Sequence, residues 1–350
     1  MTSRERVLAA CAHRAPDRIP RFDGFWQFPD AWRGRFGPAE ELTDIEIWVP
    51  EEGTFPTRAG RLREVDGWVY EVSSWGATQR SRAGTFFSET VEVPIPVGVD
   101  PDSVVFDPPE LEARFLRGCA SVGEAAELLA RAKGRHCVFG KTGGPYLRST
   151  FVRGEEQFLM DMAADPPFAR ALAEKVGRHL TAVGCEEIRR WSLQDTGIFI
   201  YDDMAHNLGP MFGPETFERV LLPAYREMIS AYRSSGARHV FLHSDGDIRP
   251  ILDMLVDAGV EGLNPLERRA GMAIEEIRKR YPRLVLTGGM CNTRTLVEGP
   301  VAKVRDEARR IIDLGRNGGI VIGTHSVSPE IPIEHFAAYV EECERYGAFG

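Results

Sequence analysis

Short runs of β-branched and apolar residues, each followed by a polar turn and a helical pattern, recur along most of this chain. The runs lie near residues 136–140, 197–201, 239–243, 259–263, 284–288 and 319–323. A helical pattern over 121–133 precedes them, and others lie between them, for example over 214–234 and 300–315. Apolar runs that alternate with helices are typical of parallel strands buried on both faces. The pattern therefore predicts repeated strand–helix units.

The N-terminal part of the chain completes the predicted set of strands. A helix is expected over 4–14, a short strand over 19–23, and a further strand in the 60–80 region. Together with the runs above, this gives about eight strands, as in an α/β barrel. No GxGxxG turn opens a helix, which disfavours an open doubly wound sheet. We predict an α/β protein with a single (βα)8 TIM-type barrel and an N-terminal extension.

Residues 60–95 differ from the rest of the chain. Their aromatic, alternating pattern with glycine turns (GWVYEVSSWGATQRS, then GTFFSETVEVP) predicts antiparallel β-hairpins. We expect these hairpins to be an insertion in one barrel domain that spans residues 1–350.

The composition narrows the class of protein. The 350 residues are 43% hydrophobic and 27% charged, which suits one large core. The net charge of −9, without a basic stripe, argues against nucleic acid as the main partner. No apolar run approaches the roughly 18 residues of a membrane span, and the N-terminus lacks the apolar stretch of a signal peptide, so we expect a cytoplasmic protein. The six cysteines show no CxxC spacing and are expected to be mostly reduced core residues.

Three of the predicted strands end in polar residues that suit catalysis or metal binding. They are followed by Tyr201-Asp202-Asp203, His243-Ser244-Asp245 and Thr324-His325. In a barrel, the carboxyl ends of the strands form the rim where catalytic groups lie. His243, Asp245 and His325 could there form an open three-ligand metal site. They could equally be an acid/base pair with a carboxylate that fixes the histidine tautomer, or histidines that cap loops.

Other residues at the same rim are candidates for substrate chemistry. Tyr201, Asp202 and Asp203 are assigned to catalysis, and only one aspartate can point into the mouth if the backbone is extended. The remaining candidates are assigned to substrate binding: Lys141, Arg148, Asn207 and Cys291. Lys141 or Arg148 could hold an anionic group, and Gly143 and Gly144 would let the backbone approach a ligand closely. For Cys291, a buried cysteine without a function is the competing interpretation.

Three long segments resemble the uroporphyrinogen decarboxylase superfamily, which includes corrinoid-linked methyltransferases. They are YDDMAHNLGPMFGPETFERVLLPAYREM (201–228), VFLHSDGDIRPILDMLVDAGVEGLNPLE (240–267) and THSVSPEIPIEHF (324–336). The resemblance implies a single (βα)8 barrel with its site at the C-terminal mouth. The decarboxylases themselves have an N-terminal Arg-Gln-Ala-Gly-Arg segment, where this chain has Arg21-Phe-Asp-Gly-Phe-Trp-Gln27. Their catalytic tyrosine falls near Thr150-Phe151, where no phenol is present. Decarboxylation of a tetrapyrrole is therefore disfavoured.

The methyltransferase branch implies a different use of the same rim. Its zinc ligands, a His-x-Cys motif and a late cysteine, fall on His243, Asp245 and His325. The replacement of both thiolates by harder donors disfavours activation of a thiol acceptor and keeps a Lewis-acid role. The resemblance thus implies a metal-assisted methyltransferase or demethylase on a small oxygenated substrate. It further implies a divalent metal such as zinc, a separate corrinoid protein and a homodimer. The alternative is a decarboxylase, a lyase acting on a small carboxylate.

Overall fold

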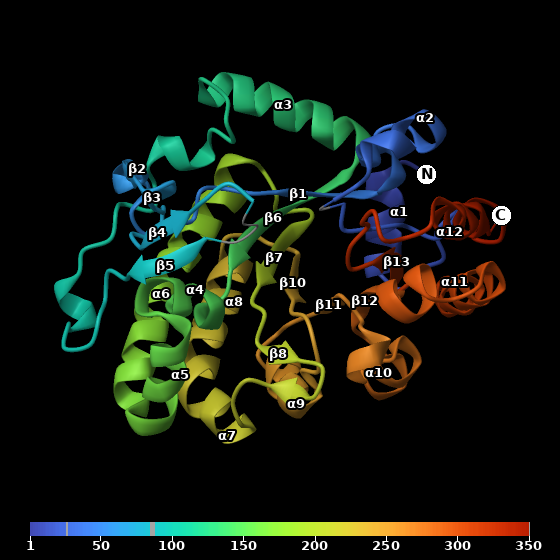
Figure 1. Ribbon diagram of the computed structural model, residues 1–350. Helices are drawn as coiled ribbons and strands as arrows, with labels where there is room; N and C mark the ends of the chain where they lie inside the picture. The colour runs from blue at the N-terminus through green and yellow to red at the C-terminus, as the bar shows by residue number, and fades with distance from the viewer. Residues whose placement is uncertain (26, 85–87, 350) are drawn as a thin grey trace.

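The computed structural model describes residues 1–25, 27–84 and 88–349 (Figure 1). Seven parallel strands form one sheet in the order β1-β6-β7-β10-β11-β12-β13. Their bounds are β1 Ile45–Trp48, β6 Cys137–Gly143, β7 Gly197–Tyr201, β10 His239–His243, β11 Gly262–Asn264, β12 Val285–Met290 and β13 Ile320–Thr324. Trp26 of the N-terminal stretch and residues 85–87 of the predicted hairpin insertion lie outside the described residues.

An extended segment near Arg21 joins the first and last strands of this sheet. The Phe22 N–H donates to the Ile322 carbonyl of β13 at 2.9 Å. On the other side, the N–H of Asp44, directly before β1, donates to the Arg21 carbonyl at 2.8 Å. The segment therefore takes the eighth position of the sheet and closes it into the predicted TIM-type barrel. A closed sheet leaves no exposed edge that could pair with another chain.

The second barrel strand lies elsewhere than predicted. It is β1, whereas the 60–80 region contributes only to a separate antiparallel sheet. That sheet contains β2 Gly60–Val65, β3 Trp68–Val72, β4 Thr78–Ser81 and β5 Glu89–Glu92. The hairpins thus form as expected, and the assignment of a barrel strand to this region is wrong. Strand β1 escaped recognition because it has four residues, one of them Glu46, instead of a continuous apolar run.

The helices surround the barrel, as Figure 1 shows. The main ones are α1 Ser3–Cys11, α3 Val122–Arg135, α4 Pro145–Arg153, α5 Glu155–Ala164, α6 Pro166–Arg190, α8 Leu222–Ser234, α9 Arg249–Asp257, α10 Ile274–Arg280, α11 Val301–Gly315 and α12 Ile333–Arg345. The two short helices are α2 Arg33–Phe36 and α7 Pro214–Thr216. Within the described ranges, no helix has both the length and the apolar character that a bilayer crossing requires.

Alternation along the strands decides which side chains reach the centre of the barrel. In β10, Val240 and Leu242 pack into the outer layer against the helices. Phe241, between them, packs inside the barrel with the β6 and β7 phenylalanines Phe139 and Phe199. Because side chains of a strand alternate between faces, His243 at the end of β10 also points inward. A one-residue shift would turn it out of the barrel.

Helix α1 covers the amino-terminal end of the barrel interior. Val7 and Cys11 belong to the same buried cluster as the three phenylalanines. Both side chains are buried, with 0% and 7% of their surface exposed. Because described residues fill this end, chemistry on the barrel axis is expected at the opposite end, where the strands terminate.

Candidate metal and substrate site

A cavity of about 820 Å³ lies at the carboxyl ends of the barrel strands. Its size falls in the range typical of small-molecule sites. The side chains that line it and carry functional groups include Asp23, Lys141, Arg148, Tyr201, Asp203, His243, Asp245, Asn264 and His325. Seven of the ten residues predicted to form the site thus line one cavity, namely Lys141, Arg148, Tyr201, Asp203, His243, Asp245 and His325.

His243, Asp245 and His325 form one potential metal-binding group. One ligand atom from each can be chosen so that all three lie within 4.8 Å of one another. The His325 Nε2 is 3.1 Å from Asp245 Oδ2, and the His243 Nε2 is 3.7 Å from Asp245 Oδ1. The two imidazole ring centres are 6.2 Å apart. The predicted convergence of these three residues on one site is therefore present in the structure.

Asn264 fixes the orientation and tautomer of His243. Its amide nitrogen donates to the Thr287 carbonyl at 3.5 Å, which leaves its oxygen to accept the His243 Nδ1–H at 2.5 Å. Tyr201, the register partner of His243 on β7, stacks on the imidazole with ring centres 4.2 Å apart. Burial lowers the pKa of His243 despite the nearby charges of Asp245 and Asp203. A neutral ring protonated at Nδ1 presents the lone pair of Nε2 to the cavity.

Asp245 has an oxygen for which the protein supplies no partner. Its Oδ1 is buried, and no described residue donates a hydrogen bond to it. Burial opposes charge on Asp245, but the hydrogen bond and charge of His325 lower its pKa. Burial alone would lower the pKa of His325, but its hydrogen bond to Asp245 and the charge of that carboxylate raise it. A buried carboxylate oxygen that faces the lone pair of His243 is costly unless a cation lies between them.

This donor set fits a divalent transition metal. Two imidazole nitrogens and one carboxylate match the three-ligand pattern of catalytic zinc sites, which keep a position for substrate. The outer hydrogen bond from His243 to Asn264 is the kind of contact that orients a metal-bound imidazole. Nitrogen and oxygen donors are harder than thiolates and also suit iron, cobalt or manganese. The three residues therefore define a metal site but do not identify which ion it binds.

The adjacent aspartates have different environments. Asp203 lines the cavity, with 44% of its side chain exposed, and its Oδ1 is 3.8 Å from the His243 Nε2. The Asp245 N–H donates to this same oxygen at 3.1 Å. Asp202 is fully buried and does not line the cavity. The structure thus has one aspartate of the pair in the mouth, as the extended backbone requires.

Asp202 anchors helix α4 instead of facing the substrate cavity. It accepts hydrogen bonds from the N–H groups of Tyr146 at 3.1 Å and Leu147 at 2.6 Å, in the first turn of α4. The Tyr225 hydroxyl donates a third at 2.6 Å. Burial raises the pKa of Asp202 to about 6, although these three hydrogen bonds act to lower it. The assignment of Asp202 to catalysis is therefore replaced by a structural role at a helix N-terminus.

Lys141 and Arg148 form the basic part of the cavity wall together with Glu52. The Lys141 ammonium is 2.9 Å and the Arg148 guanidinium 2.7 Å from the same Glu52 oxygen. The other Glu52 oxygen accepts the Gly143 N–H at 2.5 Å. Burial would raise the pKa of Glu52, but the two cations outweigh it and lower that pKa. Two cations on one carboxylate leave a local positive charge that suits one anionic group of a ligand.

Two predicted substrate-binding residues do not reach the cavity. Asn207 is exposed in the hairpin between β8 (Ala205–His206) and β9 (Gly209–Pro210). Cys291 is buried and lines a smaller neighbouring cavity of about 60 Å³, which it shares with His325. Asn207 misses the mouth because the chain leaves the rim in a hairpin after Asp203. Cys291 follows the end of β12. Both residues are close in sequence to a strand end, but neither side chain lies in the mouth.

Sequence reasoning did not identify Asn264 or Glu52. Asn264 ends β11 as His243 ends β10, and the two residues are register partners. The same strand-end argument that selected His243 applies to it. Glu52 carries no comparable signal, because it lies in a loop after β1 whose path the sequence does not define.

Comparisons with known proteins agree with this architecture. The family model described as Uroporphyrinogen decarboxylase (URO-D) matches residues 96–346. Two proteins of Methanosarcina barkeri, each named Methylcobamide:CoM methyltransferase MtaA, are 29% identical over 139 residues and 27% identical over 138 residues. Each match covers 39% of this chain and 39% of the relative, so the chain spans about two fifths of the length of these relatives. A methyltransferase structure from Methanosarcina mazei has a TM-score of 0.64 at 19% identity and 99% coverage of both chains, which indicates a shared fold.

Proposed function

This chain belongs to the uroporphyrinogen decarboxylase family, and from that premise we propose that it is a metal-assisted methyltransferase or demethylase. Its substrate would be a small molecule with a methylated oxygen, and a separate corrinoid protein would accept the methyl group. The relatives named as methylcobamide-dependent methyltransferases support this choice over decarboxylation. The metal would be held by His243, Asp245 and His325.

The observation that carries the proposal is the buried, unpartnered oxygen of Asp245 between two imidazoles. The carboxylate lies in a cavity wall where a substrate oxygen can approach it. Structural metal sites are closed by four protein ligands, whereas these three leave a position for substrate. Such an open site supports chemistry on a bound oxygen.

When bound, a divalent metal supplies a Lewis acid that draws electron density from the substrate oxygen. In the overall reaction, the bond between methyl carbon and oxygen breaks, and its electrons stay on oxygen, which takes up a proton. The methyl group forms a new bond with electrons supplied by the reduced corrinoid. Asp203 faces the cavity beside His243 and would relay a proton from solvent to the leaving oxygen. Tyr201 keeps the His243 ring in place by stacking.

The proposal is tested by incubating the zinc-loaded protein with cob(I)alamin and a panel of methyl ethers and methanol. Conversion of cob(I)alamin to methylcob(III)alamin, followed by absorbance, is expected with at least one donor. The matching control is the Asp203→Asn variant, which should bind metal but transfer methyl groups slowly. Absence of transfer with every donor would contradict the proposal.

A decarboxylase remains the second candidate because Lys141 and Arg148 offer a positive wall for a carboxylate. The two functions are distinguished by their products. A lyase would release CO2 from a small carboxylic acid without any corrinoid, and chelation of the metal would leave that activity intact if the metal plays no part.

We expect uroporphyrinogen III not to be converted to coproporphyrinogen by this protein. Arg21, the arginine of the N-terminal stretch, is buried and paired with Asp23 at 3.1 Å. The cavity cations Arg117, Lys141 and Arg148 each already contact a glutamate. A substrate with many carboxylates would therefore meet few free cations. Fluorescence detection of oxidised porphyrin products checks this, and measurable conversion would show the expectation to be wrong.

Changing Asn264 to Ala is expected to weaken metal binding by about 10- to 100-fold, because the His243 Nδ1–H loses its acceptor. Titration of the metal-free protein with Zn²⁺ against a chelating indicator measures the effect. The Asn264→Asp variant keeps an acceptor oxygen and should retain affinity much closer to that of the wild type. Equal losses in both variants would show that Asn264 does not act through this hydrogen bond.

A further inference from the structure

His325 lies one residue beyond the end of β13, so the strand itself does not fix the direction of its imidazole. Strand β13 ends at Thr324, and His325 is in a bend. The alternation of side chains that orients His243 within β10 no longer applies there. His325 is nonetheless 3.1 Å from Asp245 in the proposed metal site. Contacts from outside β13 must therefore hold the backbone at this position.

The extended segment that closes the barrel holds the chain on both sides of His325. Before it, the Asp23 Oδ1 accepts the Thr324 N–H at 2.9 Å, and the Gly24 N–H donates to the Thr324 carbonyl at 3.0 Å. After it, the Val327 N–H donates to the Gly24 carbonyl at 2.6 Å. Two of these hydrogen bonds join backbone groups, so the one that depends on a side chain is supplied by Asp23.

Asp23 is itself held by two further partners. Its Oδ1 also accepts the Tyr339 hydroxyl of α12 at 3.0 Å, and its Oδ2 is 3.1 Å from the Arg21 guanidinium. The Arg21 guanidinium in turn lies over the Tyr339 ring, 5.1 Å from the ring centre. The carboxylate therefore has little freedom to turn away from Thr324.

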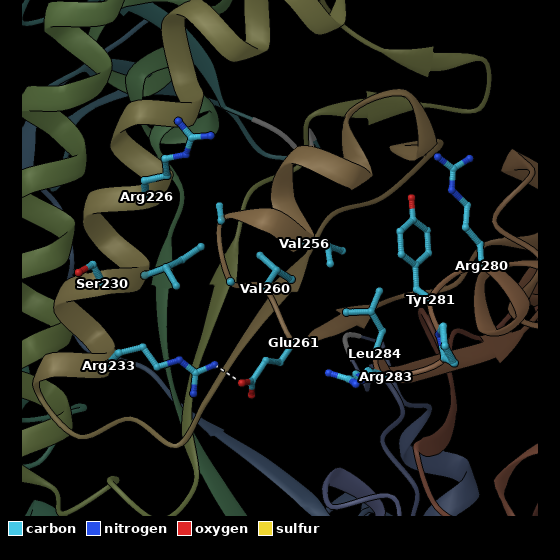
Figure 2. A pocket seen from close by; sticks show the side chains of 14 residues that line it. Arg226, Ser230, Arg233, Val256, Val260, Glu261, Arg280, Tyr281, Arg283 and Leu284 are labelled. Atoms are coloured by element: carbon cyan, nitrogen blue, oxygen red, sulfur yellow. Dashed lines mark ion pairs between the residues drawn. The ribbon is translucent and has the colours of Figure 1, made fainter.

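Burial makes this arrangement costly to disturb. The side chains of Arg21 and Asp23 are only 6% and 0% exposed. The Arg233–Glu261 pair, in the groove beside α8, is different, because 31% and 43% of its side chains are exposed (Figure 2). Water can replace a lost partner there, whereas loss of the Asp23 acceptor would leave the Thr324 N–H unsatisfied.

A buried ion pair often stabilises a protein no more than apolar side chains of similar size would. What the Asp23 carboxylate adds is direction, because it holds one backbone N–H at a fixed place. We propose that Asp23 is a positioning residue of the metal centre, which acts through Thr324 to set the place of the ligand His325. This inference rests on the metal site of the proposed function, and it adds a residue that supplies no ligand atom.

Zinc titration of the whole protein against a chelating indicator tests this inference. All Asp23 variants also carry Arg21→Met, so that no unpaired cation is left in the interior. Asp23→Asn keeps an acceptor oxygen for the Thr324 N–H, whereas Asp23→Leu has nearly the same shape without one. The Asp23→Leu protein should bind Zn²⁺ roughly tenfold or more weakly than the Asp23→Asn protein, as expected for an outer contact of a metal ligand. Asp23→Ala is measured alongside, because it lacks the acceptor and is small enough to fit where Leu does not.

The control is a second buried ion pair, Arg153–Asp161, whose side chains are 5% and 10% exposed and which lies outside the substrate cavity. The Arg153→Met/Asp161→Leu protein should bind Zn²⁺ as tightly as the wild type, even if it unfolds at a lower urea concentration. Circular dichroism confirms that the variants are folded.

The inference alone is overturned if the wild type binds Zn²⁺ tightly and the Asn, Leu and Ala variants of Asp23 bind it equally. It is also overturned if loss of the Arg153–Asp161 pair weakens binding as much as Asp23→Leu does. A wild type that binds no Zn²⁺ would overturn the metal site itself, and this inference with it.

Discussion

Changing His325 to Ala should abolish stoichiometric metal binding, with a loss of affinity of more than about 100-fold. The loss exceeds that expected for an outer-sphere partner because a direct ligand is removed. His243 and Asp245 would remain, 3.7 Å apart, and two protein ligands do not define a catalytic zinc site. Elemental analysis after dialysis against dilute Zn²⁺ measures the metal content, and methyl transfer should fall in parallel.

Two variants serve as controls for this experiment. His206→Ala removes an exposed histidine of the β8–β9 hairpin, outside the cavity, and should retain full metal content. Asp203→Asn should also retain metal but slow turnover, because we assign its carboxylate to the substrate. If wild-type protein binds no metal, or if His325→Ala binds as much as the wild type, the proposed metal centre is wrong. Loss of metal in Asp203→Asn would instead make Asp203 a ligand.

The barrel was predictable because most of its strands are continuous apolar runs that end in polar residues. The predicted runs 197–201 and 239–243 coincide with β7 and β10, and the run 319–323 overlaps β13 with a shift of one residue. Strand β1 was missed because Glu46 interrupts its short sequence. The segment near Arg21 forms only single bridges and hydrogen bonds to its neighbours, so its place depends on closure of the sheet and not on its own pattern.

The candidate site was predictable where strand period alone fixes the direction of a side chain. His243 and Tyr201 point inward because Phe241 and Phe199, two residues earlier, do so. Beyond the strand ends this rule fails. Asp202 turned away to cap α4, and Asn207 lies in an exposed hairpin. Glu52 comes from a distant loop, and only the folded chain brings it to Lys141.

Changing Glu52 to Ala should destabilise the fold by about 3–5 kcal/mol, the range for breaking a buried ion pair from one side. The variant leaves Lys141 and Arg148 in a wall where only 12% and 11% of their side chains are exposed. It also leaves the Gly143 N–H without its acceptor. Urea unfolding measures the free energy of unfolding. Glu110→Ala, at an exposed position without an ion pair in the described residues, should change it by less than about 0.5 kcal/mol.

The destabilisation should depend on pH in a direction set by Glu52. Its pKa is lower in the folded protein than its ordinary value of 4.5. The charged form is thus favoured by folding, and its contribution is fully present above pH 4.5. As the pH falls through the lowered pKa, the wild type loses this contribution. The difference in free energy of unfolding between the wild type and Glu52→Ala should therefore narrow. Replacing Lys141 by Met in the variant removes one unpaired cation and should restore part of the stability. A difference that is constant from neutral pH to well below 4.5, without rescue by Lys141→Met, would show that the ion pairs do not carry the effect.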